Sequence, residues 1–554
     1  MLSGAQLIAE GRDAAPPAPP PTAFLRANGA TSEAEYKRRC RDEGRVMYHM
    51  HVGLSTWQAT EAALVEVHGG LAEQGHSVDR FGVALDRAMG IPEPERHRAL
   101  KETGPRIGPS EWQRLGEAAP IQPHLGDYMM GFPAGFENTL RALAAGVTTI
   151  GNVGQYTAYD LLGGSDEITV TEQTVRALAA MAALRPHGAL AHSNLEDGSA
   201  TQASHFGAYV GWAALELYVV EELIGARLTH CFGNTIQQPE SRAVVHFALD
   251  DLRGRDSIGS MVYGNTVDHR PGDSKHNIAV VTEQLMCDIA LQLRRPTGHA
   301  VNPVPLTEAE RIPSAAEIIE IQLLAREIER DVRSSADLHD WAHLEKLGSA
   351  VAEYALEFRD RALAHLDEEG VDVGDAAQVL LALRRTTMPE LERLVDLAAP
   401  TDVVRLEPWK ASHVRRMTER LDKSAPRLAG VRVVLAVLEV HDLVRDALAK
   451  VLPNAGAEVI LLGSNAAVDS IVRTAVEEDA DAIVLGVYNG NALELGRRLA
   501  AGKRDQQWHG TIYMGGILNQ DTGGDLPIDA RPELSALGVR CVDDIDELLP
   551  LLAR

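Results

Sequence analysis

The sequence has few cysteines, and they are not placed to build a structural framework. The four in 554 residues, Cys40, Cys231, Cys287 and Cys541, lie far apart along the chain. No CxxC pair and no Cys/His spacing typical of a zinc site occurs. The pattern excludes disulfide-rich scaffolds and cysteine-based metal centres, and it predicts unpaired thiols in a reducing cytoplasm.

Long apolar runs and an excess of basic residues are also missing. No segment reaches 18 uncharged apolar residues, so we expect no membrane span, and the start of the chain lacks the pattern of a secretory signal. The formal net charge is −26, from 53 Lys and Arg against 79 Asp and Glu. A nucleic-acid partner is not expected, because phosphate contacts need clustered Lys and Arg. We interpret the acidic surplus as a solvated surface.

The length predicts two or three domains rather than a single core. Residues 12–22 read DAAPPAPPPTA, which indicates an extended or disordered start, and prolines interrupt a polar, basic stretch near 399–430. The predicted parts are a disordered, Pro-rich start (1–30), a β/α barrel (31–325), a helical extension (326–398), a linker (399–430) and a second α/β domain (431–554).

Five short apolar runs, each ending in Asn, alternate with helical patterns in the first half. Their asparagines are 31 to 42 residues apart, the length of one strand, one crossover helix and two loops. This alternation predicts a parallel sheet with helices outside it. A (β/α)8 TIM-type barrel is favoured over an open doubly wound sheet, because one polar end recurs at every strand. The runs are 146–152, 188–194, 228–234, 259–265 and 296–302, with 45–53 and 118–127 as further candidates.

The last part of the chain starts a second series of strands. A continuous β-branched run at 431–438 is followed by apolar segments at 458–462, 481–485, 511–514 and 539–542, with helical patterns between them. This series predicts a flavodoxin-like (Rossmann-like) domain, which binds its ligand beyond the carboxyl ends of its strands.

The loops at those carboxyl ends carry glycines and one histidine. Glycine lets a bulky ligand approach the backbone closely, and an imidazole held by a carboxylate is a good ligand for a transition metal. The alternative is that the glycines shape tight turns and the histidine is an ordinary loop residue. The candidate cofactor-binding residues are Glu439, His441, Asp442, Gly463, Ser464, Gly486, Tyr488, Gly490, Gly515 and Gly516, with His441 as the metal ligand.

Residues 431–517 resemble the cobalamin-binding domain of adenosylcobalamin-dependent glutamate mutase and of methylmalonyl-CoA mutase. That domain carries Asp-x-His-x-x-Gly, then a Ser-x-Leu turn, then Gly-Gly, and the matching positions are 439–444, 486–488 and 515–516. The resemblance implies that His441 replaces the cofactor's own nucleotide base on cobalt and that Glu439 orients this histidine. It also implies that the later turns cradle the nucleotide tail.

Three positions depart from that family pattern. Glu439 replaces Asp and is one methylene longer, and Val444 replaces Gly, so that its side chain intrudes where the tail would pass. Gly486 replaces Ser and lacks a hydroxyl that would bond the displaced base. Because His441 is kept, cobalt ligation is still expected, with an altered affinity or mode of binding.

Residues 120–325 resemble the catalytic subunit of glutamate mutase and, more distantly, the barrel of lysine and ornithine aminomutases. The similarity is clearest at 232–238, 260–265 and 296–309. Pro123 stands where the family has an arginine, and the family's arginines grip the substrate carboxylates. The resemblance therefore implies a substrate other than glutamate, with fewer or differently placed carboxylates.

Polar residues at the barrel mouth are the candidates for substrate contact, because barrel active sites lie there. Amide side chains hold a polar substrate without competing for protons, which suits radical chemistry. Two simpler interpretations stay open: Asn often ends a strand and starts a turn, and a strand histidine is often a core residue. The candidate catalytic residues are Asn152, Gln155, His192, Asn194, Asn234, Asn265 and His299.

Together the resemblances imply an adenosylcobalamin-dependent radical mutase, a carbon-skeleton isomerase that acts on a small amino or carboxylic acid. They also imply a homodimer. One alternative is a pyridoxal-phosphate- and cobalamin-dependent aminomutase, although no Schiff-base lysine is identified and Lys450 does not match the aminomutase spacing. A non-catalytic cobalamin-binding protein and a corrinoid methyl-transfer protein are further alternatives.

Overall fold

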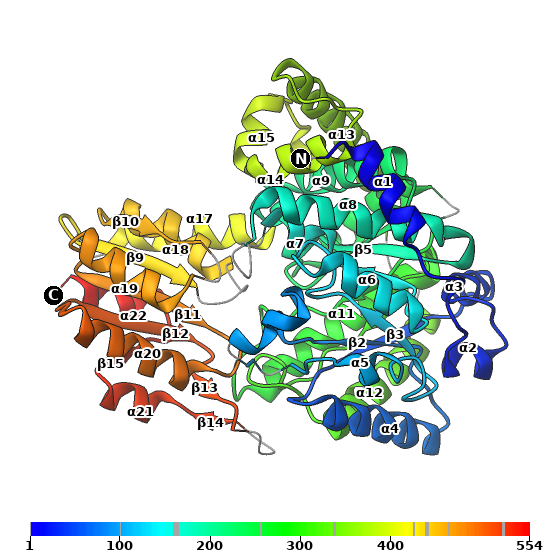
Figure 1. The fold of residues 1–554 in the computed structure, drawn as a ribbon, viewed down its shortest axis with the longest axis horizontal. Coiled ribbons are helices and arrows are strands. Elements are labelled where there is room, and N and C mark those ends of the chain that lie inside the picture. Colours follow the sequence, from blue (N-terminus) through cyan, green and yellow to red (C-terminus); the bar gives the residue numbers. More distant parts are fainter. Residues whose placement is uncertain are drawn as a thin grey trace. The chain divides into compact units, whose positions relative to one another are not determined.

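The computed structural model forms two compact units, Met1–Trp409 and Lys410–Arg554 (Figure 1). It describes residues 2–99, 101–102, 104–158, 165–254, 257–335, 340–424, 427–437, 443–463, 466–522 and 527–553. None of the helices in these ranges is both long and apolar enough to cross a membrane.

The first unit is built around a parallel β/α barrel. In the described part of the chain its sheet has eight strands in the order β6-β5-β4-β3-β2-β1-β8-β7. Tyr263 N donates a 2.9 Å hydrogen bond to Phe232 O, which joins the ends of the row and closes the barrel. The predicted TIM-type barrel is confirmed. The strands are β1 (Met47–Val52), β2 (Arg80–Val83), β3 (Gln122–Leu125), β4 (Thr149–Gly151), β5 (Leu190–Asn194), β6 (Leu228–Cys231), β7 (Met261–Tyr263) and β8 (Ala300–Asn302).

Helices cover the outside of this barrel (Figure 1). The helical patterns predicted between the apolar runs are confirmed, for example by α8 and α11. The helices are α3 (Glu33–Asp42), α4 (Trp57–Glu73), α5 (Pro109–Trp112), α6 (Gly135–Ala144), α7 (Val153–Ala158), α8 (Glu167–Ala183), α9 (Phe206–Leu217), α10 (Pro239–Arg253) and α11 (Ser274–Arg294). Shorter helical segments are η1 (Arg87–Gly90), η2 (Glu93–Arg98), η3 (Arg185–His187), η4 (Leu195–Asp197), η5 (Ser199–Gln202) and η6 (Tyr218–Ile224).

Helix α3 places a buried charged cluster against the amino ends of the strands. Glu33 Oε1 lies 2.8 Å from Arg80 Nε and 3.0 Å from Lys37 Nζ. Lys37 Nζ donates to Gly259 O at 2.6 Å, and Thr149 Oγ1 donates to Glu33 Oε2 at 2.9 Å. Burial lowers the pKa of Lys37 to about 7. The cluster fills the end of the barrel opposite the carboxyl mouth.

The predicted disorder of residues 1–30 is wrong. Residues 4–13 form helix α1 (Gly4–Asp13), which packs on α8 so closely that a Cβ at Gly11 would lie 2.3 Å from Arg176 O. Helix α2 (Ala23–Asn28) buries Phe24 against Tyr36. The proline run links two short helices, and apolar side chains on both find partners in the barrel unit, which offsets the entropic cost of ordering.

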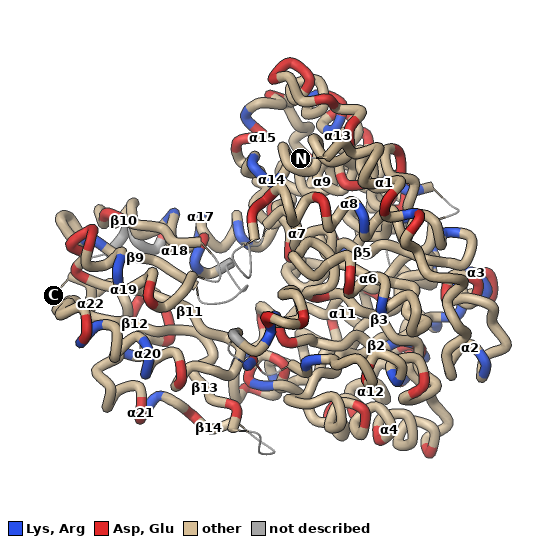
Figure 2. The backbone as a smooth tube through the Cα atoms, in the orientation of Figure 1, with Lys and Arg blue, Asp and Glu red and all other residues tan. Residues whose placement is uncertain are grey.

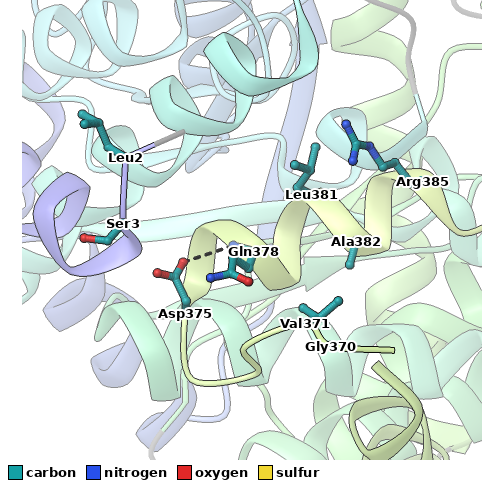
Figure 3. A pocket seen from close by; sticks show the side chains of 9 residues that line it. All are labelled: Leu2, Ser3, Gly370, Val371, Asp375, Gln378, Leu381, Ala382 and Arg385. Atoms are coloured by element: carbon teal, nitrogen blue, oxygen red, sulfur yellow. Dashed lines mark hydrogen bonds between the residues drawn. The ribbon is translucent and has the colours of Figure 1, made fainter. Parts of the chain in front are cut away.

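The start of the chain also meets the helical extension. Gly4 N donates to Asp375 Oδ2 at 2.7 Å, and Leu2 N donates to Glu172 Oε1 at 2.9 Å. A hollow of about 460 Å³ lies between Leu2, Ser3 and the side chains of helix α14 (Ala376–Arg385) (Figure 3). These contacts tie the first residues to two helices distant in sequence.

The predicted helical extension is present as α12 (Ala315–Ser335), α13 (Trp341–Glu368), α14 (Ala376–Arg385) and α15 (Met388–Val395). Two more helices, α16 (Thr401–Val404) and α17 (Trp409–Ser424), occupy the range predicted as a linker, and the boundary between the two units falls inside this range.

The second unit has, in its described residues, a parallel sheet of five strands in the order β10-β9-β11-β12-β15. This is the flavodoxin-like order 2-1-3-4-5, and the predicted fold is confirmed. The strands are β9 (Arg432–Val437), β10 (Glu458–Leu461), β11 (Ala482–Val487), β12 (Thr511–Gly516) and β15 (Val539–Cys541). The helices are α18 (Leu443–Asn454), α19 (Val468–Glu477), α20 (Ala492–Asp505), α21 (Arg531–Ala536) and α22 (Ile545–Leu552), and β13 (Asn519–Gln520) and β14 (Ile528–Asp529) form a small hairpin that was not predicted.

Charged residues are spread along both units in Figure 2, with acidic and basic positions intermixed on the helices and the strands largely free of them. The acidic surplus is therefore distributed over many helices rather than gathered on one element.

Candidate functional site

Four histidines from three strands meet inside the barrel. The ring centroids of His49 and His51 are 4.7 Å apart, those of His49 and His124 are 5.8 Å apart, and those of His124 and His192 are 4.7 Å apart. Their strands β1, β3 and β5 are not neighbours in the sheet. Side chains that touch across an intervening strand of a closed barrel must lie in its interior, where alternate residues point.

Glycines on the intervening strands leave the room that these rings occupy. A Cβ at Gly82 of β2 would lie 2.7 Å from His51 Nε2 and 3.0 Å from His49 Nε2. A Cβ at Gly151 of β4 would lie 2.6 Å from His192 Cδ2. The imidazole cluster therefore depends on these two residues having no side chain.

Burial keeps these imidazoles neutral. It lowers the pKa of His51 to about 3 and lowers the pKa of His49, His124 and His192 well below that of a free imidazole. Neighbouring imidazoles and Arg80 lower these pKa values further. Neither ring nitrogen of His49, nor Nε2 of His124, has a hydrogen-bond partner. Such buried polar atoms are rare, and they point to a ligand or ordered water at this position.

The predicted amides at the carboxyl ends of β4 and β5 lie at the barrel mouth, where they mainly order the loops. Asn152 Oδ1 accepts from Gly154 N at 3.0 Å and from Asn194 N at 2.8 Å, and Asn152 Nδ2 donates to Asp197 Oδ2 at 2.8 Å. Asn194 Oδ1 accepts from Glu196 N at 3.1 Å. All polar atoms of the Asn152 side chain are thus engaged within the protein.

Gln155, on α7, joins two mouth loops. Its Nε2 donates to Asp127 Oδ1 at 2.9 Å, and its Oε1 accepts from Tyr128 N at 3.1 Å. Behind it, the next residue, Tyr156, accepts a backbone hydrogen bond from Arg384 of the helical extension, whose guanidinium lies 5.4 Å from the Tyr156 ring centroid. The extension therefore supports the mouth helix that carries Gln155.

Asn234 and Asn265 also make loop contacts. Asn234 Oδ1 accepts from Thr266 Oγ1 at 2.6 Å and from Thr266 N at 3.1 Å. Asn265 Nδ2 donates to Asp268 Oδ2 at 2.7 Å, and Asn265 Oδ1 accepts from Asp268 N at 3.2 Å. The structure thus brings the predicted amides to one mouth, in geometries typical of turn-forming asparagines.

The two predicted histidines have different environments. His192 belongs to the interior cluster, and its Nδ1 lies 3.0 Å from Ser260 Oγ. His299 precedes β8, towards the amino end of the barrel, where its Nε2 donates to His230 O at 2.9 Å and its Nδ1 lies 2.6 Å from Thr297 Oγ1. With both ring nitrogens engaged, His299 has the contacts of a core histidine.

The interior residues His49, His51 and His124 were not among the predicted site residues. Nor were Tyr263, the last residue of β7, and Glu308, which follows β8. The Tyr263 ring lies 4.9 Å from the His51 ring, and burial raises the pKa of Glu308 to about 7. The His-x-His spacing of β1 was the available signal, because residues two apart in a strand share a face.

In the second unit, six of the ten candidate cofactor residues are described, and all six lie at or shortly after the carboxyl ends of the strands. Gly486 and Tyr488 belong to the end of β11, Gly515 and Gly516 end β12, and Gly463 and Gly490 lie in the adjoining loops. Glu439, His441, Asp442 and Ser464 lie outside the described residues.

The glycine-bearing edge has the features that a large flat cofactor needs. β9 and β11 flank the point where the strand order reverses, which is where such sheets bind ligands. The loop that contains His441 follows β9, and side chains are missing at Gly486, Gly515 and Gly516 on the next two strands. The part of the chain that the structure describes contains no cluster of three or more His, Cys, Asp or Glu placed to hold a metal ion.

Comparison with known proteins identifies this second unit more closely. Residues 430–525 match the family model described as "B12 binding domain". A 106-residue stretch is 34% identical to the fused isobutyryl-CoA mutase of Nocardia farcinica (strain IFM 10152). The stretch makes up 19% of this chain and 9% of that protein, so the chain matches only a small part of its relative's length.

These comparisons support the cobalamin interpretation of the C-terminal unit. They favour cobalamin-dependent mutases in general and leave the predicted glutamate mutase subfamily untested. The described glycine edge fits the group that the family model names, and within the predicted set His441 remains the residue expected to bind cobalt.

Proposed function

We propose that this chain is an adenosylcobalamin-dependent radical mutase that rearranges a small amino or carboxylic acid other than glutamate. The observation that carries the proposal is the presence of a closed β/α barrel and a B12-binding domain in one chain. A barrel supplies a substrate site at its mouth, and a B12-binding domain supplies the cofactor that this chemistry needs.

The C-terminal unit would hold the cofactor. His441 would bind cobalt, with Glu439 as its carboxylate partner. The glycines at the ends of β11 and β12 would let the cofactor approach the backbone. When bound, adenosylcobalamin supplies the radical with which such a rearrangement starts.

The barrel interior would hold the substrate through neutral hydrogen-bonding groups. His124 is fully buried and His51 lies nearer the mouth, and both imidazoles stay uncharged at neutral pH. Neutral imidazoles hold a polar group without supplying a strong acid or base, which protects a radical rearrangement from competing proton transfer. A substrate group that reaches His124 is also removed from bulk water.

Glu308 is the described mouth residue best suited to handle a proton. Its pKa is raised to about 7 by burial, so that its carboxyl group exchanges a proton near neutral pH. We propose that it binds a substrate group that gains or loses a proton, while Asn152 and Gln155 keep Asp197 and Asp127 in place at the mouth.

Titration of the purified protein with adenosylcobalamin tests the proposal, with the visible spectrum as readout. We expect a dissociation constant below about 10 µM, or about 7 kcal/mol of binding free energy, and a spectrum typical of histidine-bound cobalt. His441→Ala should lose that spectral form. Absence of binding by the wild-type protein would refute the proposal.

A substrate screen with small amino and carboxylic acids follows, with loss of the adenosylcobalamin spectrum and product analysis as readouts. Conversion of glutamate to 3-methylaspartate would refute the part of the proposal that excludes glutamate as the substrate. A visible band that disappears on borohydride treatment would instead favour the pyridoxal-phosphate-dependent aminomutase.

A further inference from the structure

Two neighbouring imidazoles inside the barrel have ring nitrogens that contact no other polar group. Both nitrogens of His49 and Nε2 of His124 are buried and lack a hydrogen-bond partner among the described residues. The centroids of the two rings lie 5.8 Å apart. A hydroxyl oxygen about 2.8 Å from one nitrogen of each ring would lie about 4 Å from both centroids, which this separation allows. One small polar group can therefore contact both rings.

Gly126 leaves Nε2 of His124 open towards the barrel mouth. It is the first residue after β3, and it is partly exposed. A Cβ built on Gly126 would lie 3.1 Å from Nε2 of His124 and 3.8 Å from Nε2 of His192. A side chain at position 126 would thus cover the nitrogen of His124, and its absence lets a group at the mouth approach that nitrogen closely.

The protons on these two rings define what such a group must offer. His124 Nδ1 lies 3.1 Å from the carbonyl oxygen of Thr149, so Nδ1 donates and the neutral ring presents a lone pair at Nε2. The neutral ring of His49 has one N–H and one lone pair, and neither is engaged in the described part of the chain. The site therefore accepts a hydrogen bond at His124 and can donate one at His49.

A charged group is poorly suited to this position. Burial lowers the pKa of both imidazoles well below that of a free imidazole, and the nearby Arg80 guanidinium lowers it further. The positive charge that disfavours an imidazolium also disfavours an ammonium group. A carboxylate only accepts hydrogen bonds, so it would lose its hydration and face the lone pair at Nε2 of His124. A neutral hydroxyl, by contrast, both donates and accepts.

We propose that the barrel takes a substrate with an alcoholic hydroxyl group and binds that hydroxyl between His49 and His124, where it donates to Nε2 of His124 and accepts from His49. The inference rests on the proposed function, because it describes the substrate of the proposed mutase. It narrows the small amino or carboxylic acid to one that carries a hydroxyl at the end that enters the barrel.

Direct binding to the full-length protein, without added cobalamin, tests this assignment. The probes are straight-chain acids of three to five carbons whose far end is a hydroxyl, a methyl, an ammonium or a second carboxylate. Isothermal titration calorimetry gives their dissociation constants. We expect, for at least one chain length, that the hydroxy acid binds about tenfold tighter than its three counterparts, because it alone makes two hydrogen bonds in the buried site.

Gly126→Ala tests where the hydroxyl lies. The added methyl group covers Nε2 of His124, so the hydroxy acid should then bind at most about threefold tighter than the methyl-ended acid. Gly69→Ala is the matched control, because Gly69 lies in helix α4 with nothing within 4 Å of the added Cβ. The control should keep the full preference for the hydroxyl. An undiminished preference in Gly126→Ala would overturn the assignment.

Two substitutions of His124 separate the loss of the acceptor from a general loss of packing. His124→Leu removes the acceptor and should abolish the preference for the hydroxyl. His124→Gln keeps a side chain that can accept a hydrogen bond, so it should retain part of the preference. Thermal midpoints of all variants show whether each one is folded. Equal preferences in the two variants would contradict the role given to Nε2.

The outcomes separate this inference from the proposed function. A wild-type protein that binds the hydroxy acid no tighter than the methyl-ended acid would overturn the inference, and ordered water alone would then occupy the nitrogens of His49 and His124. Tightest binding of an ammonium or dicarboxylate probe, or no binding of any probe, would also overturn it. The cobalamin titration judges the proposed function on its own: cobalamin binding without a hydroxyl preference refutes this inference alone, and a hydroxyl preference without cobalamin binding refutes the proposed function alone.

Discussion

His124 Nδ1 lies 3.1 Å from the backbone carbonyl oxygen of Thr149 on the next strand of the barrel. A carbonyl oxygen only accepts, so Nδ1 must carry the proton and donate it. Because burial keeps the ring neutral, Nε2 is left with an unprotonated lone pair. That nitrogen has no partner in the described structure and lies 3.1 Å from the Cβ position of Gly126, near the barrel mouth. The fold therefore fixes a hydrogen-bond acceptor inside the barrel.

We expect the tautomer of His124 to be visible by NMR. In protein labelled with 15N-histidine, one ring should show a protonated Nδ1 and an unprotonated Nε2 from pH 7.5 down to pH 5, because burial lowers its pKa well below 6.5. His124→Gln identifies the signal by its disappearance. A ring that gains a second proton between pH 7 and 6 would contradict the assignment.

Acid should destabilise the barrel through its buried neutral histidines. Burial lowers the pKa of His246 to about 3 from 6.5, so between these values the unfolded chain binds a proton that the folded chain does not. The contribution of neutral His246 to the free energy of unfolding is therefore full above pH 6.5. Below that pH it falls by about 1.4 kcal/mol per pH unit. In urea unfolding between pH 7.5 and 5, His246→Gln should show a smaller loss of stability with acid. Equal slopes would argue against a neutral His246.

Arg384 should control the order of the mouth helix α7. It donates to Tyr156 O and lies over the Tyr156 ring, whereas its neighbour Arg385 bonds Glu167 Oε2 at 2.8 Å. We expect Arg384→Ala to raise deuterium uptake at residues 153–158 and Arg385→Ala to leave it unchanged. Equal uptake in both variants would show that α7 is held by other contacts.

Most of the fold was predictable because the sequence patterns that indicate its strands are local. The strands from β4 to β8 are short apolar runs with polar ends, and the spacing between them sets the barrel. β2 was missed because Arg80–Val83 reads RFGV, and its burial depends on a distant carboxylate, Glu33. The helices within residues 1–30 were missed because their formation also depends on distant residues. The side chains that bury Leu7 and Phe24 lie elsewhere in the chain.

The candidate site was less predictable than the fold. The amides were predictable because they recur at strand ends, yet the polar atoms of Asn152 and Asn265 form hydrogen bonds with neighbouring loops. The interior histidines meet only when the barrel closes, and nothing in a single strand shows that His49 and His124 face each other. Likewise, only the closed barrel shows which imidazole rings lie where a side chain of residue 82 would be.

Gly82 gives the most direct test of that arrangement. In Gly82→Ala the new methyl group would lie 2.7 Å from His51 Nε2 and 3.0 Å from His49 Nε2, so both rings must shift. We expect a loss of about 1–3 kcal/mol in the free energy of unfolding, as for other overpacked interiors. Gly69→Ala is the matched control, because Gly69 lies in helix α4 with nothing within 4 Å of the added Cβ, and alanine there should add about 0.5–1 kcal/mol of stability. His51→Ala opens space beside Gly82, so the double variant should lose less than the sum of the two single variants. Strict additivity in urea unfolding would mean that Gly82 and His51 do not touch, and the interior histidine cluster would have to be abandoned.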